Sequence, residues 1–251
     1  MLELSPLFFA LAVPGVMIAG ISKGGFGSGV SFAATPLLAI VVDPAIALGV
    51  MLPLLMLIDV AALKPYWRQW SVSDTWALII GGLPGVAIGA VVLARANDDL
   101  LRLLIGTIAL AFVVYQIAGR RAAMPSTERV FPTWVGLLTG VVGGFTSLVS
   151  HAGGPAVAVY LLSRGLPKTT YQATTVISFG VINIFKAVAY GFLGIISLDT
   201  LWANLVLAPF AVLGTWLGVV LHRRIPADLF FAVMYVFLAV TGVKLIYDAL
   251  V

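Results

Sequence analysis

The fold of this chain depends on the stretch Ile21-Ser22-Lys23-Gly24-Gly25-Phe26-Gly27-Ser28-Gly29, which interrupts a long apolar segment near the amino terminus. A second apolar segment is interrupted in the same way by a stretch that runs from Gly143-Gly144-Phe145 to His151-Ala152-Gly153-Gly154-Pro155. Irregular backbone at membrane depth is tolerated only where it is buried in protein or lines a cavity. Two matching breaks therefore indicate a binding site within a membrane.

The composition supports a membrane location. Hydrophobic residues make up 61% of the 251 residues, charged residues only 10%, and the mean hydropathy is +1.12. So few polar groups cannot cover a surface that faces water. Uncharged or nearly uncharged runs of about 20 residues recur, which is the length that crosses the hydrocarbon core as a helix. We therefore predict an all-α polytopic membrane protein.

The charged residues of the connections are divided between the two sides of the predicted spans. One side holds Lys23, Lys64, Arg68, Arg120, Arg121, Arg129, Arg164, Lys168, Arg223 and Arg224. The other side holds Glu3, Asp43, Arg95, Asp98, Asp99, Arg102, His151, Asp199 and Asp248. Because basic residues favour the cytoplasmic side, we expect the first set in the cytoplasm and both termini outside. The expected location is the cell inner (plasma) membrane.

The residues around the two breaks recur in the same order in both halves of the chain. The matched pairs are Gly24-Gly25-Phe26 with Gly143-Gly144-Phe145, Pro36 with Pro155, Asp59 with Asn183, Pro84 with Pro209, and Gly89 with Gly214. An ordered series of this kind indicates an internal repeat. Each unit holds about five hydrophobic segments, an odd number, so the second unit must be inserted upside down relative to the first.

These observations predict one transport domain built from two inverted-topology repeats, with broken or re-entrant helices at the glycine motifs. We expect the first transmembrane repeat at residues 1–122 and the second, inverted repeat at residues 132–251. Residues 123–131 form the expected cytoplasmic linker between them.

The residue inventory excludes several other function classes. The chain has no cysteine and two histidines, which leaves no thiolate site and little for a metal cage or an enzyme active site. It also lacks a GxxxxGK[ST] motif and any extramembrane segment long enough to fold alone, so ATP-driven pumping by this chain is not expected. The net charge of +4 lies in loops between spans, as expected for a membrane protein without a nucleic-acid partner. We predict no cofactor, no metal and no enzymatic activity.

The breaks favour an anionic ligand. A helix that begins inside the membrane presents unpaired N–H groups equivalent to roughly half a positive charge, and glycine lets an oxyanion approach that backbone closely. Polar residues within spans usually face the bundle interior with a partner. The candidate substrate-binding residues are Lys23, Gly24, Gly25, Ser28, Ser31, Gly144, Ser147, Ser150, His151, Gly153, Gly154, Asn183 and Lys186, and the candidates for coupling are Asp59 and His151.

Each candidate also has a structural interpretation. Glycines let membrane helices pack closely, and hydroxyls often bond to the preceding turn. Lys23 suits a cytoplasmic anchor, Lys186 suits a side chain that reaches the interface, and Asp59 lies near the expected cytoplasmic end of its helix. A lone histidine such as His151 commonly donates one hydrogen bond without exchanging a proton. The sequence leaves these alternatives open.

The same motifs resemble those of a known family. The segment Ser22 to Gly29, followed by Thr35-Pro36-Leu37-Leu38, resembles the amino-terminal signature of the TauE/SafE family of sulfite exporters. The second glycine-rich stretch and Tyr171-Gln172-Ala173-Thr174-Thr175 resemble the corresponding second signature and the stretch after it. The resemblance covers nearly the whole chain. It implies a permease for sulfite, sulfonates or related sulfur-containing anions, and fixes neither the anion nor the direction.

We therefore predict a secondary transporter that moves a small sulfur-containing anion, such as sulfite or an organosulfonate, by alternating access. Proton coupling through Asp59 and His151 is the expected driving force. An anion channel could use the same glycine breaks, and accumulation against a gradient would distinguish the two. The expected partners are the anion, the lipid bilayer and a coupling proton, and a homodimer is one option for the oligomeric state.

Overall fold

The computed structural model describes residues 5–26, 31–121, 130–221 and 227–251, and the side chains in these ranges except those of residues 26, 119–121 and 227–234. Their regular structure is entirely helical. The helices are α1 (Pro6–Ile21), α2 (Ala34–Leu38), α3 (Pro44–Leu63), α4 (Val72–Leu93), α5 (Asp98–Arg121), α6 (Thr133–Ser150), α7 (Gly154–Ser163), α8 (Lys168–Phe192), α9 (Leu198–Leu221) and α10 (Ala227–Leu250). Short turns η1 (Ser22–Phe26), η2 (Ser31–Ala33) and η3 (Lys64–Tyr66) complete them.

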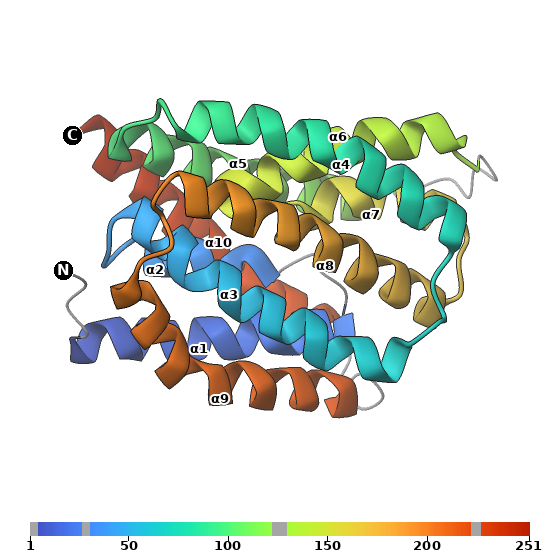
Figure 1. The fold of residues 1–251 in the computed structure, drawn as a ribbon, viewed down its shortest axis with the longest axis horizontal. Helices are drawn as coiled ribbons and strands as arrows, with labels where there is room; N and C mark the ends of the chain where they lie inside the picture. The colour runs from blue at the N-terminus through green and yellow to red at the C-terminus, as the bar shows by residue number, and fades with distance from the viewer. Residues whose placement is uncertain (1–4, 27–30, 122–129, 222–226) are drawn as a thin grey trace.

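Seven helices in the described ranges are long and apolar enough to cross a membrane. This confirms the predicted all-α polytopic membrane fold. The long helices lie side by side, and both termini lie at the same end of the bundle (Figure 1). The α3–α4 and α7–α8 connections, which carry Lys64, Arg68 and Arg164, lie at the opposite end (Figure 1). This segregation agrees with the sidedness that the charge pattern predicts.

Two helices are too short to cross. Helix α2 has 5 residues and α7 has 10, and 10 residues span about 15 Å, half of the hydrocarbon core. Helix α2 returns to the end where α1 began, and α7 returns to the end where α6 began (Figure 1). We call α1–α2 the first hairpin and α6–α7 the second hairpin. The described parts of the glycine-rich stretches therefore lie where these two hairpins reverse direction, and the hairpins open toward opposite ends of the bundle (Figure 1).

Each hairpin packs on a helix from the other half of the chain. Helix α1 lies along α9, and α6 lies along α4. A Cβ atom added to Gly20 would lie 2.8 Å from the carbonyl oxygen of Ala211, and one added to Gly140 would lie 2.8 Å from that of Leu78. Real Cβ atoms essentially never come so close to backbone, so these contacts require glycine. The small residues let the backbones approach as in other membrane helix pairs.

The space between the two hairpins is closed by α3 and α8. These helices pack against each other, and each also contacts a long helix of the opposite half, α3 on α9 and α8 on α4. The polar side chains predicted within spans, Asp59 on α3 and Asn183 and Lys186 on α8, are all buried. The fold thus places the charged residues in the middle of these two spans in its interior, whereas Lys168, the first residue of α8, is exposed.

Candidate functional site

The second hairpin reverses direction at His151. Helix α6 continues through Gly143 and Gly144 and ends at Ser150, and His151 adopts the left-handed conformation with φ 58°. The N–H groups of His151 and Ala152 donate to the carbonyl oxygens of Ser147 and Thr146, at 2.9 and 3.2 Å. These bonds satisfy carbonyl groups that a helix end otherwise leaves unpaired. The helix therefore breaks at His151, after Gly143 and Gly144, which lie within α6.

Lys186 reaches this turn from α8. Its Nζ atom donates to Ser147 Oγ at 3.0 Å and lies 2.7 Å from His151 Nδ1. An ammonium group only donates, so a charged Lys186 requires His151 Nδ1 to accept and places the ring hydrogen on Nε2, 3.2 Å from the carbonyl oxygen of Leu48. None of the salt bridges between described side chains includes Lys186, although the residue is 0% exposed. Its described partners are thus uncharged.

Asp59 joins the first hairpin to α8. One carboxylate oxygen forms a salt bridge with Lys23 Nζ, and the other accepts a hydrogen bond from Asn183 Nδ2 at 2.7 Å. Lys23 is 3% exposed and Asp59 5%. The repeat alignment predicts that Asp59 and Asn183 lie close together, and the structure places them in direct contact. Lys186 lines the same small cavity as Lys23 and Asn183, and its own hydrogen bonds are made to the second hairpin.

Two residues that sequence reasoning missed hold η1, the π-helical end of α1. Tyr66 donates from its hydroxyl to the carbonyl oxygen of Gly24 at 2.9 Å, and the amide of Gln172 donates to the carbonyl oxygen of Lys23. Both carbonyls lie at a helix end, where they need outside partners. Tyr66 lies near the end of a span, where aromatic residues are typical interfacial anchors, so its sequence position gives no sign of this contact. These bonds fix the backbone from which the Lys23 side chain extends toward Asp59.

These groups surround one small cavity. Its lining residues are Lys23, Ser31, Leu55, Ser147, His151, Gly154, Phe179, Asn183 and Lys186. The volume is about 10 Å³, which is room for about one water molecule. Sulfur oxyanions, with three or four oxygen atoms around sulfur, are larger. Within the described ranges, no group of three or more His, Asp or Glu side chains is placed to hold a metal ion.

The chain matches a family of membrane proteins along most of its length. A family model described as "Sulfite exporter TauE/SafE" matches residues 12–245. The chain belongs to the TauE/SafE family. The matched range contains both glycine-rich stretches and the Tyr171–Thr175 segment, so the resemblance is confirmed for nearly the whole chain. The chain matches no curated protein and no solved structure.

Seven of the thirteen predicted substrate-binding residues line the cavity of this TauE/SafE protein. They are Lys23, Ser31, Ser147, His151, Gly154, Asn183 and Lys186. Gly153 lies beside them, because a Cβ added to it would come within 2.9 Å of Ser147 Cβ. Ser28 lies outside the described residues.

The remaining candidates are placed in the helices around the cavity. Added Cβ atoms on Gly24 and Gly25 would overlap the carbonyl oxygens of Thr215 and Gly218 on α9, and one on Gly144 would overlap that of Gly82 on α4. Ser150 donates its hydroxyl to the carbonyl oxygen of Thr146 at 3.0 Å. For these four residues, the structure favours the packing and local-bonding interpretations over a contact with the anion.

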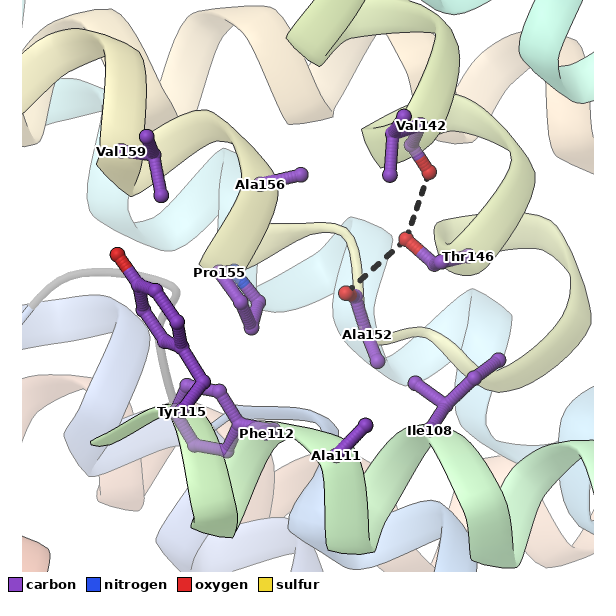
Figure 2. Close-up of a pocket in the computed structure, with 10 residues that line it drawn as sticks. All are labelled: Ile108, Ala111, Phe112, Tyr115, Val142, Thr146, Ala152, Pro155, Ala156 and Val159. Carbon is purple, nitrogen blue, oxygen red and sulfur yellow. Dashed lines mark hydrogen bonds between the residues drawn. The ribbon is translucent and has the colours of Figure 1, made fainter. Parts of the chain in front are cut away.

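A second, apolar groove lies behind the turn of the second hairpin. It has a volume of about 290 Å³ and is lined by residues of α5, α6, α7 and the turn, including Phe112, Val142, Ala152 and Ala156 (Figure 2). Thr146 bridges the carbonyl oxygens of Val142 and Ala152 at its edge, at 2.8 and 3.1 Å. Its walls offer almost no polar group to an anion. The turn therefore separates a nearly filled polar cavity from an open apolar groove.

Proposed function

We propose that this protein is a secondary transporter of the plasma (inner) membrane that binds a small sulfur-containing oxyanion between its two hairpins and moves it by alternating access. The observation that carries the proposal is Lys186, a fully buried lysine whose described partners, Ser147 and His151, are uncharged. A charge within a membrane protein normally faces a partner or a substrate pathway. A sulfite or sulfonate group would supply the missing negative charge.

The neutral donors around Lys186 suit an oxyanion with three or more acceptor oxygens. Ser147 and Asn183 line the cavity, and so does Gly154, the first residue of α7. A helix amino terminus favours negative charge. Several such donors bind the anion without the tight ion pair that would hinder its release.

The small volume of the cavity supports a cycle with a closed intermediate. At about 10 Å³, the cavity must widen before an oxyanion can enter. The apolar groove of about 290 Å³ on the far side of Ala152 gives the turn of the second hairpin a space into which it can move. We propose that this displacement opens the site.

The packing of the helices supports the inverted repeat. Helices α1 to α5 correspond in order to α6 to α10. The contact of α1 with α9 and the contact of α6 with α4 are therefore equivalent, because α1 corresponds to α6 and α9 corresponds to α4. The two hairpins open toward opposite ends (Figure 1). In repeats of this kind, one half moves against the other around a fixed site. We keep residues 1–122 and 132–251 as the two repeats, and a homodimer as one option for the oligomeric state.

Proton coupling is the proposed driving force. Asp59 and His151 each bind residues that line the cavity. Asp59 binds Lys23 and Asn183, and His151 binds Lys186. Uptake of a proton at either residue would change the hydrogen bonds that hold Lys23 or Lys186. Release of the anion could therefore be linked to protonation.

The function is tested in proteoliposomes with an outwardly or inwardly directed pH gradient. We expect sulfite or methanesulfonate to accumulate against its own gradient, and Lys186→Met to abolish the accumulation. Lys244→Met is the matched control, because Lys244 is half-exposed on α10 and pairs with Asp248 at 2.6 Å. Anion conductance without accumulation would indicate a channel. Normal accumulation by Lys186→Met would refute the role of this residue.

A further inference from the structure

The net charge of the site follows from its buried ionisable residues and their hydrogen-bond partners. Lys23, Asp59 and Lys186 are the buried ionisable residues bound within the cluster, together with His151. His151 is neutral when its Nδ1 accepts from Lys186 and its Nε2–H faces the carbonyl oxygen of Leu48. With both lysines protonated and Asp59 ionised, the described residues of the site carry a single positive charge.

The helix ends at the turn do not change this count. Helix α6 ends at Ser150 and α7 begins at Gly154, so a carboxyl end and an amino end meet at the same turn. Their partial charges are opposite, each roughly half a unit. They nearly cancel, and one full positive charge remains for the anion to balance.

From this count we infer that the site selects a monovalent oxyanion, such as a sulfonate or hydrogensulfite, over a divalent one, such as sulfate or sulfite. This inference rests on the proposed function. A monovalent anion makes the loaded cavity neutral, whereas a divalent anion leaves one uncompensated negative charge. An unpaired charge in a region of low dielectric constant is strongly unfavourable.

Among the described residues, no group near the cavity can take up a proton to balance a divalent anion without loss of a bond. A proton added to His151 would occupy Nδ1, the atom that accepts from Lys186. A proton added to Asp59 would remove the negative partner of Lys23. Sulfite is therefore carried as hydrogensulfite, with the proton on the anion itself.

The apolar part of the lining agrees with a sulfonate. Leu55 and Phe179 face the cavity beside the polar residues, and both are buried. The three oxygens of a sulfonate can meet Lys186 and the neutral donors while its carbon group packs on these two side chains. Sulfate, with a fourth oxygen in that position, would leave a polar atom against an apolar wall.

The first test compares two anions of fixed charge on the purified, detergent-solubilised protein. Calorimetric binding of methanesulfonate, a monovalent anion, is measured against binding of sulfate at constant ionic strength set with gluconate. We expect methanesulfonate to bind at least about tenfold more tightly, which corresponds to about 1.4 kcal/mol. Equal or tighter binding of sulfate overturns the inference and leaves the proposed function intact. Binding of neither methanesulfonate, sulfate nor sulfite overturns both.

The second test changes the charge of the site. Asp59→Asn leaves two positive charges, and we expect it to raise the ratio of sulfate to methanesulfonate affinity at least about tenfold. The double variant Lys23→Gln/Asp59→Asn removes the ion pair but retains one net positive charge, so it should return to the preference of the unchanged protein. The same preference in all three proteins overturns the inference. Should Asp59→Asn not fold, the first test still decides it.

Discussion

Asn183 donates a hydrogen bond to Asp59 across 2.7 Å, although the two residues lie 124 positions apart. The other oxygen of the same carboxylate faces Lys23. One buried carboxylate thus connects the first hairpin, α3 and α8. The hydrogen bond between α3 and α8 needs a donor on Asn183 and an acceptor on Asp59. A substitution that gives both positions an acceptor removes this bond.

Asn183→Asp would place two carboxylates in contact. Buried like charges repel, and a buried charge that loses its partner costs about 3–5 kcal/mol. We expect a clearly lower midpoint of thermal unfolding in detergent and loss of anion binding. Asn97→Asp is the control, because Asn97 is exposed and its side-chain oxygen accepts from the N–H of Leu100 at 2.9 Å, a role that aspartate also fills. Equal midpoints for the two variants would contradict this account of the Asp59–Asn183 contact.

Gly144→Ala should destabilise the contact between α6 and α4. The added Cβ would overlap the carbonyl oxygen of Gly82, and overpacking of this kind typically costs about 1–3 kcal/mol. The expected result is a lower thermal midpoint by fluorescence size-exclusion chromatography. Gly191→Ala is the matched control in α8, since nothing lies within 4 Å of the position where its Cβ would be. A Gly144→Ala protein as stable as Gly191→Ala would show that α6 and α4 pack differently.

Tyr66→Phe removes a single hydroxyl from the end of α1. The carbonyl oxygen of Gly24 then loses its described partner, and an unsatisfied buried acceptor costs about 1–3 kcal/mol. We expect η1 to open more often, which exposes the backbone after the buried Lys23 to trypsin. Mass spectrometry of the digest measures that cleavage. Tyr247→Phe, at an exposed position, is the control and should leave the cleavage rate unchanged. An unchanged rate for Tyr66→Phe would show that other contacts hold η1.

Much of this fold and part of its site could be predicted because the relevant signals are local. Apolar runs of about 20 residues mark spans, and Asp59, Asn183 and Lys186 stand out because polar groups inside spans need partners. Gln172 and Tyr66 carry no such signal. Their bonds to Lys23 and Gly24 join residues 149 and 42 positions apart, and nothing in the sequence near a carbonyl group identifies its donor.

The glycines show a second limit of sequence reasoning. Gly144, on a helix contact, and Gly154, on the cavity, occur in one stretch with similar neighbours. Both a close helix contact and an approaching anion require the absence of a Cβ atom. Only the position of α4 separates the two roles, and that position is a property of the assembled bundle.

Ala156→Trp should slow transport without preventing binding. Ala156 lines the apolar groove behind the second hairpin (Figure 2), and an indole ring there would fill the space that the turn needs when the cavity widens. We expect turnover in proteoliposomes to fall about tenfold, with the affinity of the purified protein for methanesulfonate unchanged. Leu162→Trp, on the exposed side of α7, is the control. Normal turnover by Ala156→Trp would exclude movement of the turn into this groove.

The contact of α1 with α9 also constrains how the protein is made. Helix α1 leaves the ribosome long before α9, and together with η1 it presents glycines, among them Gly20 and Gly24, whose close neighbours lie on α9. Until α9 has been inserted, that surface faces lipid without its final partner. Chains that stop before α9 should therefore leave α1 uncovered and become targets for membrane proteases. The two halves encoded as separate polypeptides should accumulate only when synthesised together.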